Sequence, residues 1–283
     1  MAAWSDGYWM SQDGLRLHYR DYAGDPARPP ILCIPGLTRN ARDFEALAGR
    51  LSGEWRLICV DLRGRGDSLH ARDAMSYVPQ VYVDDVEALI AELALERFVL
   101  FGTSLGGLVG TLLALRDSGR IAGALLNDVG PVLDPRGIER IRGYVGKSQS
   151  WPTWLHAARH FSRIQREVYP DWTLDDWLGF AKRLCRLKQG RVVLDYDMRI
   201  AEPLRANAAD ASFDLWPAFR ALGGTPTLLV RGALSDLLSD ETAAQMKREI
   251  STLEAVTVPG VGHAPTLSEP VTQAAIARLL ARI

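Results

Sequence analysis

Short runs of apolar residues recur along the chain, and segments with helical spacing of apolar positions separate them. Each run ends at a turn or polar residue, and the runs cover residues 31–34, 57–60, 98–101, 124–126, 227–230 and 255–258. Continuous apolar runs are typical of strands that are buried on both faces of a sheet. Upstream, Leu15, Leu17 and Tyr19 alternate with polar residues, which predicts a half-exposed antiparallel edge strand. Strands that alternate with helices indicate an α/β protein with a mostly parallel sheet.

The rhythm of strands and helices breaks between residues 132 and 212. This segment has helical patterns and four of the eight Trp residues, but no run that is typical of a buried strand. Apolar runs that are typical of buried strands occur again from about Thr225. We therefore predict one core, formed by residues 1–131 and 213–283. A helical cap, residues 132–212, is inserted after the sixth strand and lies over the carboxyl ends of the sheet.

Charge and cysteine usage narrow the classes of partner and compartment. The chain has 283 residues with 33 basic and 34 acidic side chains, so its net charge is −1. Without a global positive field, nucleic acid and anionic lipid are not expected partners. The apolar runs are shorter than the roughly 18 residues that a membrane span needs. Three cysteines without a CxxC pattern fit a reducing compartment, and the first residues show no signal-peptide pattern. We expect a cytoplasmic protein that binds a small-molecule substrate.

The strongest chemical motif is Gly102-Thr103-Ser104-Leu105-Gly106. It follows an apolar strand and opens an apolar helix, the context in which GxSxG forms a nucleophile elbow. Such a sharp turn exposes the serine hydroxyl. Strand and helix then approach too closely for a Cβ atom at the two glycines. The motif therefore predicts that Ser104 is a nucleophile.

A serine hydroxyl needs a base to take its proton at neutral pH. His263 stands just after the last predicted strand, in a loop at the same sheet edge as Ser104, so we expect it to be the base. His156 and His160 have i, i+4 spacing, but they lack the intervening Glu of the HExxH pattern and an evident third ligand. We therefore expect no metal site.

The base in turn needs a carboxylate that orients it and stabilises the imidazolium. Two candidates lie at the carboxyl edge of the sheet: Asp236 after the run 227–230, and Asp128 after the run 124–126. Asp236 lies one strand before the histidine loop, and Ser…Asp…His is the hydrolase order along the chain. We favour Asp236 and keep Asp128 as the alternative.

An acyl-transfer enzyme must also hold an oxyanion with preorganised N–H groups. The backbone of Leu105, the residue after the nucleophile, is one expected donor. The loop after the first buried strand should supply the other, most simply the N–H of Leu37. We therefore predict an oxyanion hole formed by the backbone of these two residues.

Together these motifs resemble those of the α/β-hydrolase fold family, in its branch of small proteins with a helical cap. The resemblance covers nearly the whole chain outside the cap and rests on Pro35-Gly36, Asp61–Ser68, the Ser104 elbow, the Asp236 turn and Gly262-His263. It implies an eight-stranded, mostly parallel sheet flanked by helices, and a serine hydrolase that needs no cofactor. Similar epoxide hydrolases and haloalkane dehalogenases carry Asp at the elbow, where this chain has Ser104.

The expected reaction is hydrolysis of a small, largely apolar carboxylic ester or lactone through an acyl-enzyme. One alternative is hydrolysis of a carbon–carbon bond in a diketone-type ring-cleavage product, which similar proteins perform with the same triad. An alternative from another class is a small-molecule receptor on this scaffold with little turnover.

Four residues are candidates for substrate binding. Arg39 and Asn40 follow the Pro35-Gly36 turn, and an Arg at a pocket mouth suits a substrate carboxylate. Trp151 and Trp154 lie in the cap, where Trp either anchors a core or lines an apolar pocket. Spacing alone does not choose between these roles. The charged segment Asp61–Ser68 is assigned a structural role.

Overall fold

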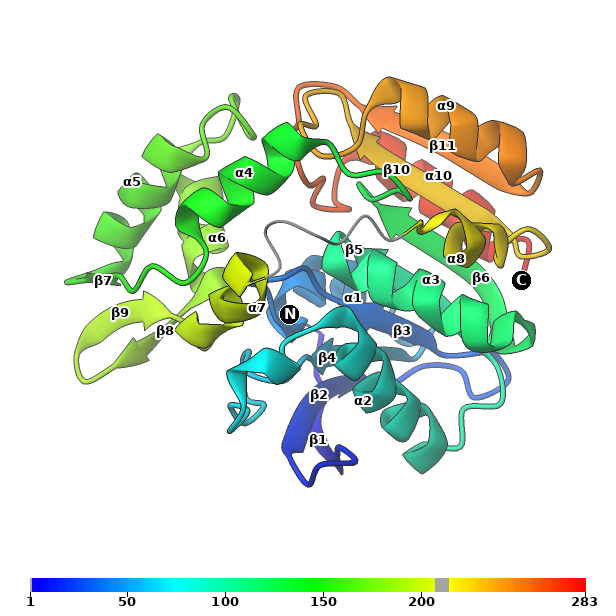
Figure 1. Cartoon of the computed structure of the whole chain (residues 1–283), viewed down its shortest axis with the longest axis horizontal. Coiled ribbons are helices and arrows are strands. Elements are labelled where there is room, and N and C mark those ends of the chain that lie inside the picture. The colour runs from blue at the N-terminus through cyan, green and yellow to red at the C-terminus, as the bar shows by residue number, and fades with distance from the viewer. Residues whose placement is uncertain (1, 207–213) are drawn as a thin grey trace.

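The computed structural model describes residues 2–206 and 214–283. Strands and helices alternate along the core as the apolar runs predict (Figure 1). The main sheet consists of β1 (Ser5–Met10), β2 (Arg16–Tyr22), β3 (Ile31–Ile34), β4 (Leu57–Asp61), β5 (Phe98–Thr103), β6 (Ile121–Asn127), β10 (Thr227–Gly232) and β11 (Leu253–Val258). The core helices are α1 (Glu45–Leu51), α2 (Pro79–Glu92), α3 (Leu105–Asp117), α8 (Trp216–Arg220), α9 (Asp240–Glu249) and α10 (Pro270–Leu280). Short 3₁₀ helices cover Ala41–Phe44 (η1), Ala74–Ser76 (η2), Ser118–Arg120 (η3) and Met198–Ile200 (η4).

The sheet has eight strands in the order β1-β2-β4-β3-β5-β6-β10-β11. The two pairings at one edge, β1 with β2 and β2 with β4, are antiparallel, and all the others are parallel. The prediction of an eight-stranded, mostly parallel sheet is confirmed. Because β5, β6, β10 and β11 are parallel neighbours, the loops that follow them gather at one edge of the sheet.

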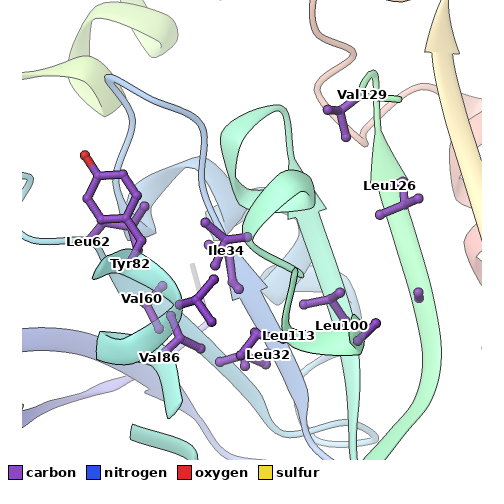
Figure 2. Packing of buried hydrophobic residues seen from close by; sticks show 14 of the residues in the cluster. Leu32, Ile34, Val60, Leu62, Tyr82, Val86, Leu100, Leu113, Leu126 and Val129 are labelled. Atoms are coloured by element: carbon purple, nitrogen blue, oxygen red, sulfur yellow. The ribbon is translucent and has the colours of Figure 1, made fainter. Parts of the chain in front are cut away.

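Two hydrophobic cores cover the two faces of the sheet. In β3, Leu32 and Ile34 belong to one core, while Ile31 and Cys33 belong to the other, as the two-residue period of a strand requires. Helices α2 and α3 cover the first face, and α1 and α10 cover the second (Figure 1). Figure 2 shows Leu32 and Ile34 packed beside Val86 of α2. The continuous apolar runs therefore mark strands with both faces buried.

The segment after β6 forms the cap, which lies to one side of the core in Figure 1. Its elements are α4 (Pro135–Tyr144), β7 (Ser150–Trp151), α5 (Trp154–Ile164), α6 (Leu174–Leu184), β8 (Cys185–Lys188), β9 (Arg191–Leu194) and α7 (Ala201–Ala206). The cap is mostly helical, as the sequence predicts, and it also contains a small antiparallel sheet of β7, β9 and β8 that the sequence did not indicate. The expected limit between residues 212 and 213 lies outside the described residues. Among the described residues, no helix is both long and apolar enough to cross a membrane.

The Asp61–Ser68 loop braces the molecule through two fully buried arginines. Arg63, 1% exposed, donates hydrogen bonds to the carboxylates of Asp85 and Asp13. Arg65, 0% exposed, donates from Nε to the carbonyl oxygen of Leu37 at 2.9 Å and from Nη1 to that of Arg63. The loop thus ties the strand β4 to the segment after β3.

A buried histidine links the antiparallel edge of the sheet to the same loop. His18 Nδ1 lies 2.7 Å from Asp61 Oδ2, and its Nε2 lies 3.0 Å from Asp6 Oδ1. Burial lowers the pKa of His18, but the hydrogen bond and charge of Asp61, aided by Asp6, outweigh it and raise the pKa above its ordinary value. The protonated ring is therefore the stabilising form in the folded protein.

The raised pKa of His18 predicts a stability that falls as the pH rises. Its contribution is complete below the unfolded pKa and is lost as the pH passes through the folded pKa. We therefore expect the free energy of unfolding to fall as the pH rises from near the ordinary pKa of histidine through the raised pKa of the folded protein. Chemical unfolding of wild type and His18→Asn across this range should show a flatter profile for the variant. His156→Asn, an exposed control on α5, should keep the wild-type slope. Parallel profiles for wild type and His18→Asn would contradict the assignment.

Candidate active site

Ser104 stands at the junction of β5 and α3 in a strained backbone conformation. Its φ of 52° and ψ of −117° lie outside the regions that non-glycine residues ordinarily occupy. The strand and helix approach so closely that a Cβ atom on Gly102 would lie 2.5 Å from the Cα atom of Gly107. On the other side, a Cβ atom on Gly106 would overlap the backbone carbonyl of Ile34. The motif therefore forms the expected elbow, with the serine side chain on a cavity.

A chain of two hydrogen bonds connects Ser104 to a buried carboxylate. His263 Nε2 lies 2.8 Å from Ser104 Oγ, and His263 Nδ1 lies 2.7 Å from Asp128 Oδ2. Because a carboxylate only accepts, the Nδ1 atom carries the proton and Nε2 is free to accept from the hydroxyl. The Asp128 side chain is 0% exposed and that of His263 is 9% exposed. The structure therefore brings Ser104 and His263 together as expected, with Asp128 as the third member.

Three donors hold the Asp128 carboxylate. Gly232 N–H donates to Oδ1 at 2.8 Å, while Ser235 Oγ and His263 Nδ1 share Oδ2, the former at 2.6 Å. Asp128 itself has a φ of 55°, in the left-handed region that Asp tolerates better than most residues. Such an arrangement fixes the orientation of the histidine ring in a site shielded from water.

The expectation that Asp236 orients the histidine is corrected by this geometry. Asp236 faces α4, where its Oδ2 and Oδ1 accept hydrogen bonds from Arg140 Nε at 2.5 Å and Nη2 at 2.8 Å. Burial raises the pKa of Asp236, but Arg140 outweighs it and keeps the pKa below its ordinary value, with a smaller effect from His263. Asp236 is therefore engaged in an ion pair between the cap and the core.

The order of strands in the sheet explains which carboxylate reaches the histidine. Asp128 directly follows β6, which lies between β5 and β10 and so beside the elbow. Asp236 comes four residues after the end of β10, and only Ser235 of that turn points back to the site. Asp128 also satisfies the chain order Ser…Asp…His, so that order does not discriminate between the two carboxylates.

Two hydrogen bonds that the sequence did not indicate hold the histidine loop. Asn127 donates from Nδ2 to the carbonyl oxygen of Pro265 at 2.8 Å and to Thr103 Oγ1 at 3.2 Å. From the cap, Tyr169 donates its hydroxyl to the carbonyl oxygen of Ala264 at 2.7 Å. Asn127 is a polar residue at the end of an apolar strand, and this position is the one signal that could have identified it.

Of the two backbone groups expected to bind an oxyanion, one lies in the elbow and the other in the neighbouring loop after β3. Leu105 is the first residue of α3, so its N–H has no acceptor within the helix. Leu37 lines the cavity beside Ser104, and Arg65 holds its carbonyl oxygen. The loop approaches the elbow closely, because a Cβ atom on Gly36 would lie 3.7 Å from Ser104 Cβ. The oxyanion hole itself stays a prediction.

A cavity of about 410 Å³ opens over Ser104 between the core and the cap. Its volume lies in the range of small-molecule sites. The wall combines aromatic and charged side chains that come from the Gly36 loop, η1, α4, α5, α6 and the segment between α5 and α6. Among them are Arg39, Asp43, Arg140, Phe161, Tyr169, Trp172, Phe180 and Arg183. The lining is therefore more highly charged than the expected apolar ester would require.

Of the four candidate binding residues, only Arg39 lines this cavity. Asn40 is 1% exposed, accepts the N–H of Arg42 at the start of η1 and donates to the carbonyl oxygen of Arg183. Trp151 and Trp154 pack into the cap core. A different tryptophan of the cap, Trp172, lines the cavity. It stacks on Tyr169 with ring centroids 3.7 Å apart. The expectations for Asn40, Trp151 and Trp154 are therefore wrong.

Comparison with known proteins gives a family for this geometry. The model of the alpha/beta hydrolase family matches residues 31–276. The chain belongs to the alpha/beta hydrolase family. This membership confirms the resemblance, the fold class and the prediction that the protein is a hydrolase.

Individual members of the family cover nearly the same length. The chain is 40% identical over 278 residues to a 3-hydroxybutyrate-oligomer hydrolase of Cupriavidus necator, covering 95% of this chain and 94% of that protein. It is 30% identical to a 2-(acetamidomethylene)succinate hydrolase of Mesorhizobium japonicum, covering 83% and 81%. A crystal structure of an alpha/beta hydrolase from Novosphingobium aromaticivorans covers all of both chains with 55% identity and a TM-score of 0.96.

Proposed function

We propose that this alpha/beta hydrolase is a serine ester hydrolase that works through an acyl-enzyme. The observation that carries the proposal is the chain of hydrogen bonds from Ser104 Oγ through His263 to Asp128. This arrangement activates a hydroxyl without any other group, since the ring accepts the hydroxyl proton and the buried carboxylate stabilises the resulting imidazolium.

The reaction proceeds in two half-reactions. His263 takes the proton of Ser104 as Oγ attacks the ester carbonyl carbon, and the N–H groups of Leu37 and Leu105 hold the oxyanion. The imidazolium then protonates the leaving alcohol, and the acyl group stays on Ser104. Water deprotonated by His263 attacks this acyl ester, and the acid leaves as Ser104 recovers its proton.

The proposed substrate class is a short oligomer of a 3-hydroxy acid, such as 3-hydroxybutyrate. Two observations support it. The relative at 40% identity is named for such oligomers, and the cavity wall carries Arg39 and Arg183, which suit a substrate that ends in a carboxylate. The substrate expectation is thereby refined from a largely apolar ester to one with a charged end.

Reaction with a fluorophosphonate probe tests the mechanism. The probe should modify Ser104 alone, because this hydroxyl shares a hydrogen bond with an imidazole. Peptide mapping by mass spectrometry should find the adduct on the Ser104 peptide and leave the Ser235 peptide unmodified. Heat-unfolded protein is the control and should not react.

An intact folded protein that does not react would overturn the proposal. A panel of hydroxybutyrate oligomers, simple esters and a vinylogous diketo acid then separates the reactions. Preference for the diketo acid would favour carbon–carbon bond hydrolysis. Stoichiometric binding without turnover would favour a receptor.

Two features of organisation stay proposals. The limits of the core, residues 1–131 and 213–283, and of the cap, residues 132–212, rest on the break in the strand rhythm. The cytoplasm is the proposed compartment, which the three buried free cysteines support.

A further inference from the structure

Two guanidinium groups share one carboxylate on the cavity wall. Asp43, in η1, accepts hydrogen bonds from Nε and Nη2 of Arg39, the former at 2.6 Å. Arg183, near the end of α6, lies with its Nε 3.9 Å from Oδ1 of the same carboxylate. Asp43 is already engaged by the fork of Arg39, so this part of the wall carries a surplus positive charge.

Among the described residues, the Arg183 guanidinium has no hydrogen-bonded acceptor. Its side chain is 28% exposed and lines the cavity, so its donors are available to a ligand. Burial lowers the pKa of Arg183, Asp43 raises it less, and the positive charge of Arg39 lowers it further. An arginine nevertheless stays charged at neutral pH. A second anion beside it would relieve this unfavourable environment.

Two side chains of the core bind the backbone of Arg183 and hold this residue in place. Asn40 Nδ2 and Arg42 Nε donate to the carbonyl oxygen of Arg183 at 3.0 and 3.1 Å. Within α6, Gly179 lines the cavity, and a Cβ atom there would lie 3.4 Å from Arg183 Nη1. Gly179 therefore lies directly beside the guanidinium, one turn before Arg183 on α6.

Arg39 connects this cluster to the reacting serine. A Cβ atom on Gly36 would lie 3.4 Å from Arg39 Cγ and 3.7 Å from Ser104 Cβ, so the two side chains flank that glycine. The Arg39 guanidinium lies over the ring of Phe180, 4.5 Å from its centroid, and Phe180 is one turn before Arg183 on α6. The aliphatic part of Arg39 therefore lies beside the site of acyl transfer, and Arg39 and Arg183 line the same cavity as Ser104.

The other acidic residues of the wall are farther away. Asp175 and Asp176 lie in the first turn of α6, two turns from Arg183. Asp176 is engaged in the capping box, where its Oδ2 accepts from the N–H and hydroxyl of Thr173. Neither carboxylate therefore serves as a hydrogen-bond acceptor for the Arg183 guanidinium.

We infer that Arg183, together with Arg39, binds the free carboxylate of the substrate and so selects anionic esters over neutral ones. The inference rests on the proposed function. It assigns a carboxylate subsite at the junction of α6 with η1, beside Ser104. An ester bound there presents its carbonyl group to the serine with its charged end held by the two guanidinium groups.

Matched substrates test this subsite. A 3-hydroxybutyrate trimer and the same trimer with a terminal carboxamide differ only in the charge at one end. The measured quantity is the ratio of kcat/KM for the acid to that for the amide. Arg183→Gln should lower this ratio about 10- to 100-fold, and Arg183→Lys should lower it less because it keeps the charge but loses the planar fork. Lys182→Gln, the exposed neighbour on α6, is the control and should leave the ratio within about twofold.

A second measurement does not depend on the identity of the substrate. The 3-hydroxybutyrate anion should slow fluorophosphonate labelling of Ser104 in the wild type and in Lys182→Gln, but about tenfold less effectively in Arg183→Gln. 3-Hydroxybutyramide should protect poorly in all three proteins. Equal protection by anion and amide in the wild type, or an unchanged trimer ratio in Arg183→Gln, would overturn the subsite. If neither trimer is cleaved while the anion protects as described, the proposed substrate fails and the carboxylate subsite stands.

Discussion

Asp128→Asn should lower kcat for a neutral chromogenic ester by about 10⁴-fold, whereas Asp236→Asn should stay within a few-fold of wild type. The carboxylate of Asp128 accepts the Nδ1 proton of His263 at 2.7 Å in a fully buried position. An asparagine there removes the negative charge that stabilises the imidazolium, and its amide group favours the wrong tautomer of the ring. Asp236 has no such contact, because Arg140 holds both its oxygens.

Steady-state kinetics on both variants decides between the two carboxylates. Ser235→Ala is an informative intermediate, because it removes one donor to Asp128 Oδ2 without removing its charge. We expect a decrease in kcat of roughly tenfold for this variant, because one hydrogen bond to a charged group is lost. Circular dichroism and thermal unfolding confirm that each variant is folded. An equal loss of kcat in Asp236→Asn, or a kcat of Asp128→Asn within tenfold of wild type, would show that Asp128 is not the carboxylate that orients His263.

The nucleophile and the base could be predicted because their signals are local in the sequence. Ser104 lies in a contiguous motif between an apolar strand and an apolar helix, and His263 follows the last apolar run. The identity of the acid depends on information that is not local. Both Asp128 and Asp236 follow parallel strands, and only the lateral order of β6 and β10 and the direction of the Ser235 turn separate them.

The cap was harder to predict because its small sheet has no apolar run. In β8, Leu187 is 64% exposed and lies between two charged residues. This strand is mostly exposed, so its sequence lacks the apolar run that identifies a buried strand. The signal that could have identified the hairpin is its turn. Gln189 and Gly190 both have positive φ, as a two-residue type I′ turn requires. Which Trp reaches the cavity depends on how the cap helices pack, and Trp172 is placed by its stacking on Tyr169.

Gly106→Ala should destabilise the protein by more than about 3 kcal/mol and leave little folded enzyme. The added methyl group would overlap the carbonyl of Ile34 and lie 2.8 Å from the carbonyl oxygen of Pro35. These are backbone atoms at the end of β3, a central strand with both faces buried. They cannot rotate away as a side chain would. Relief therefore requires α3 to move away from β3, and this movement would also displace Ser104 and the neighbouring Leu37 loop.

The same substitution at Gly49 separates this steric effect from helix propensity. Gly49 lies in α1, where a Cβ atom would meet no other atom within 4 Å. Gly49→Ala should therefore keep or raise the stability by up to about 1 kcal/mol, because alanine loses less backbone entropy than glycine. Urea unfolding of both variants gives the comparison. A Gly106→Ala protein as stable as wild type would mean that the elbow does not require the close approach of β3 and α3. The strained backbone of Ser104 would then need another explanation.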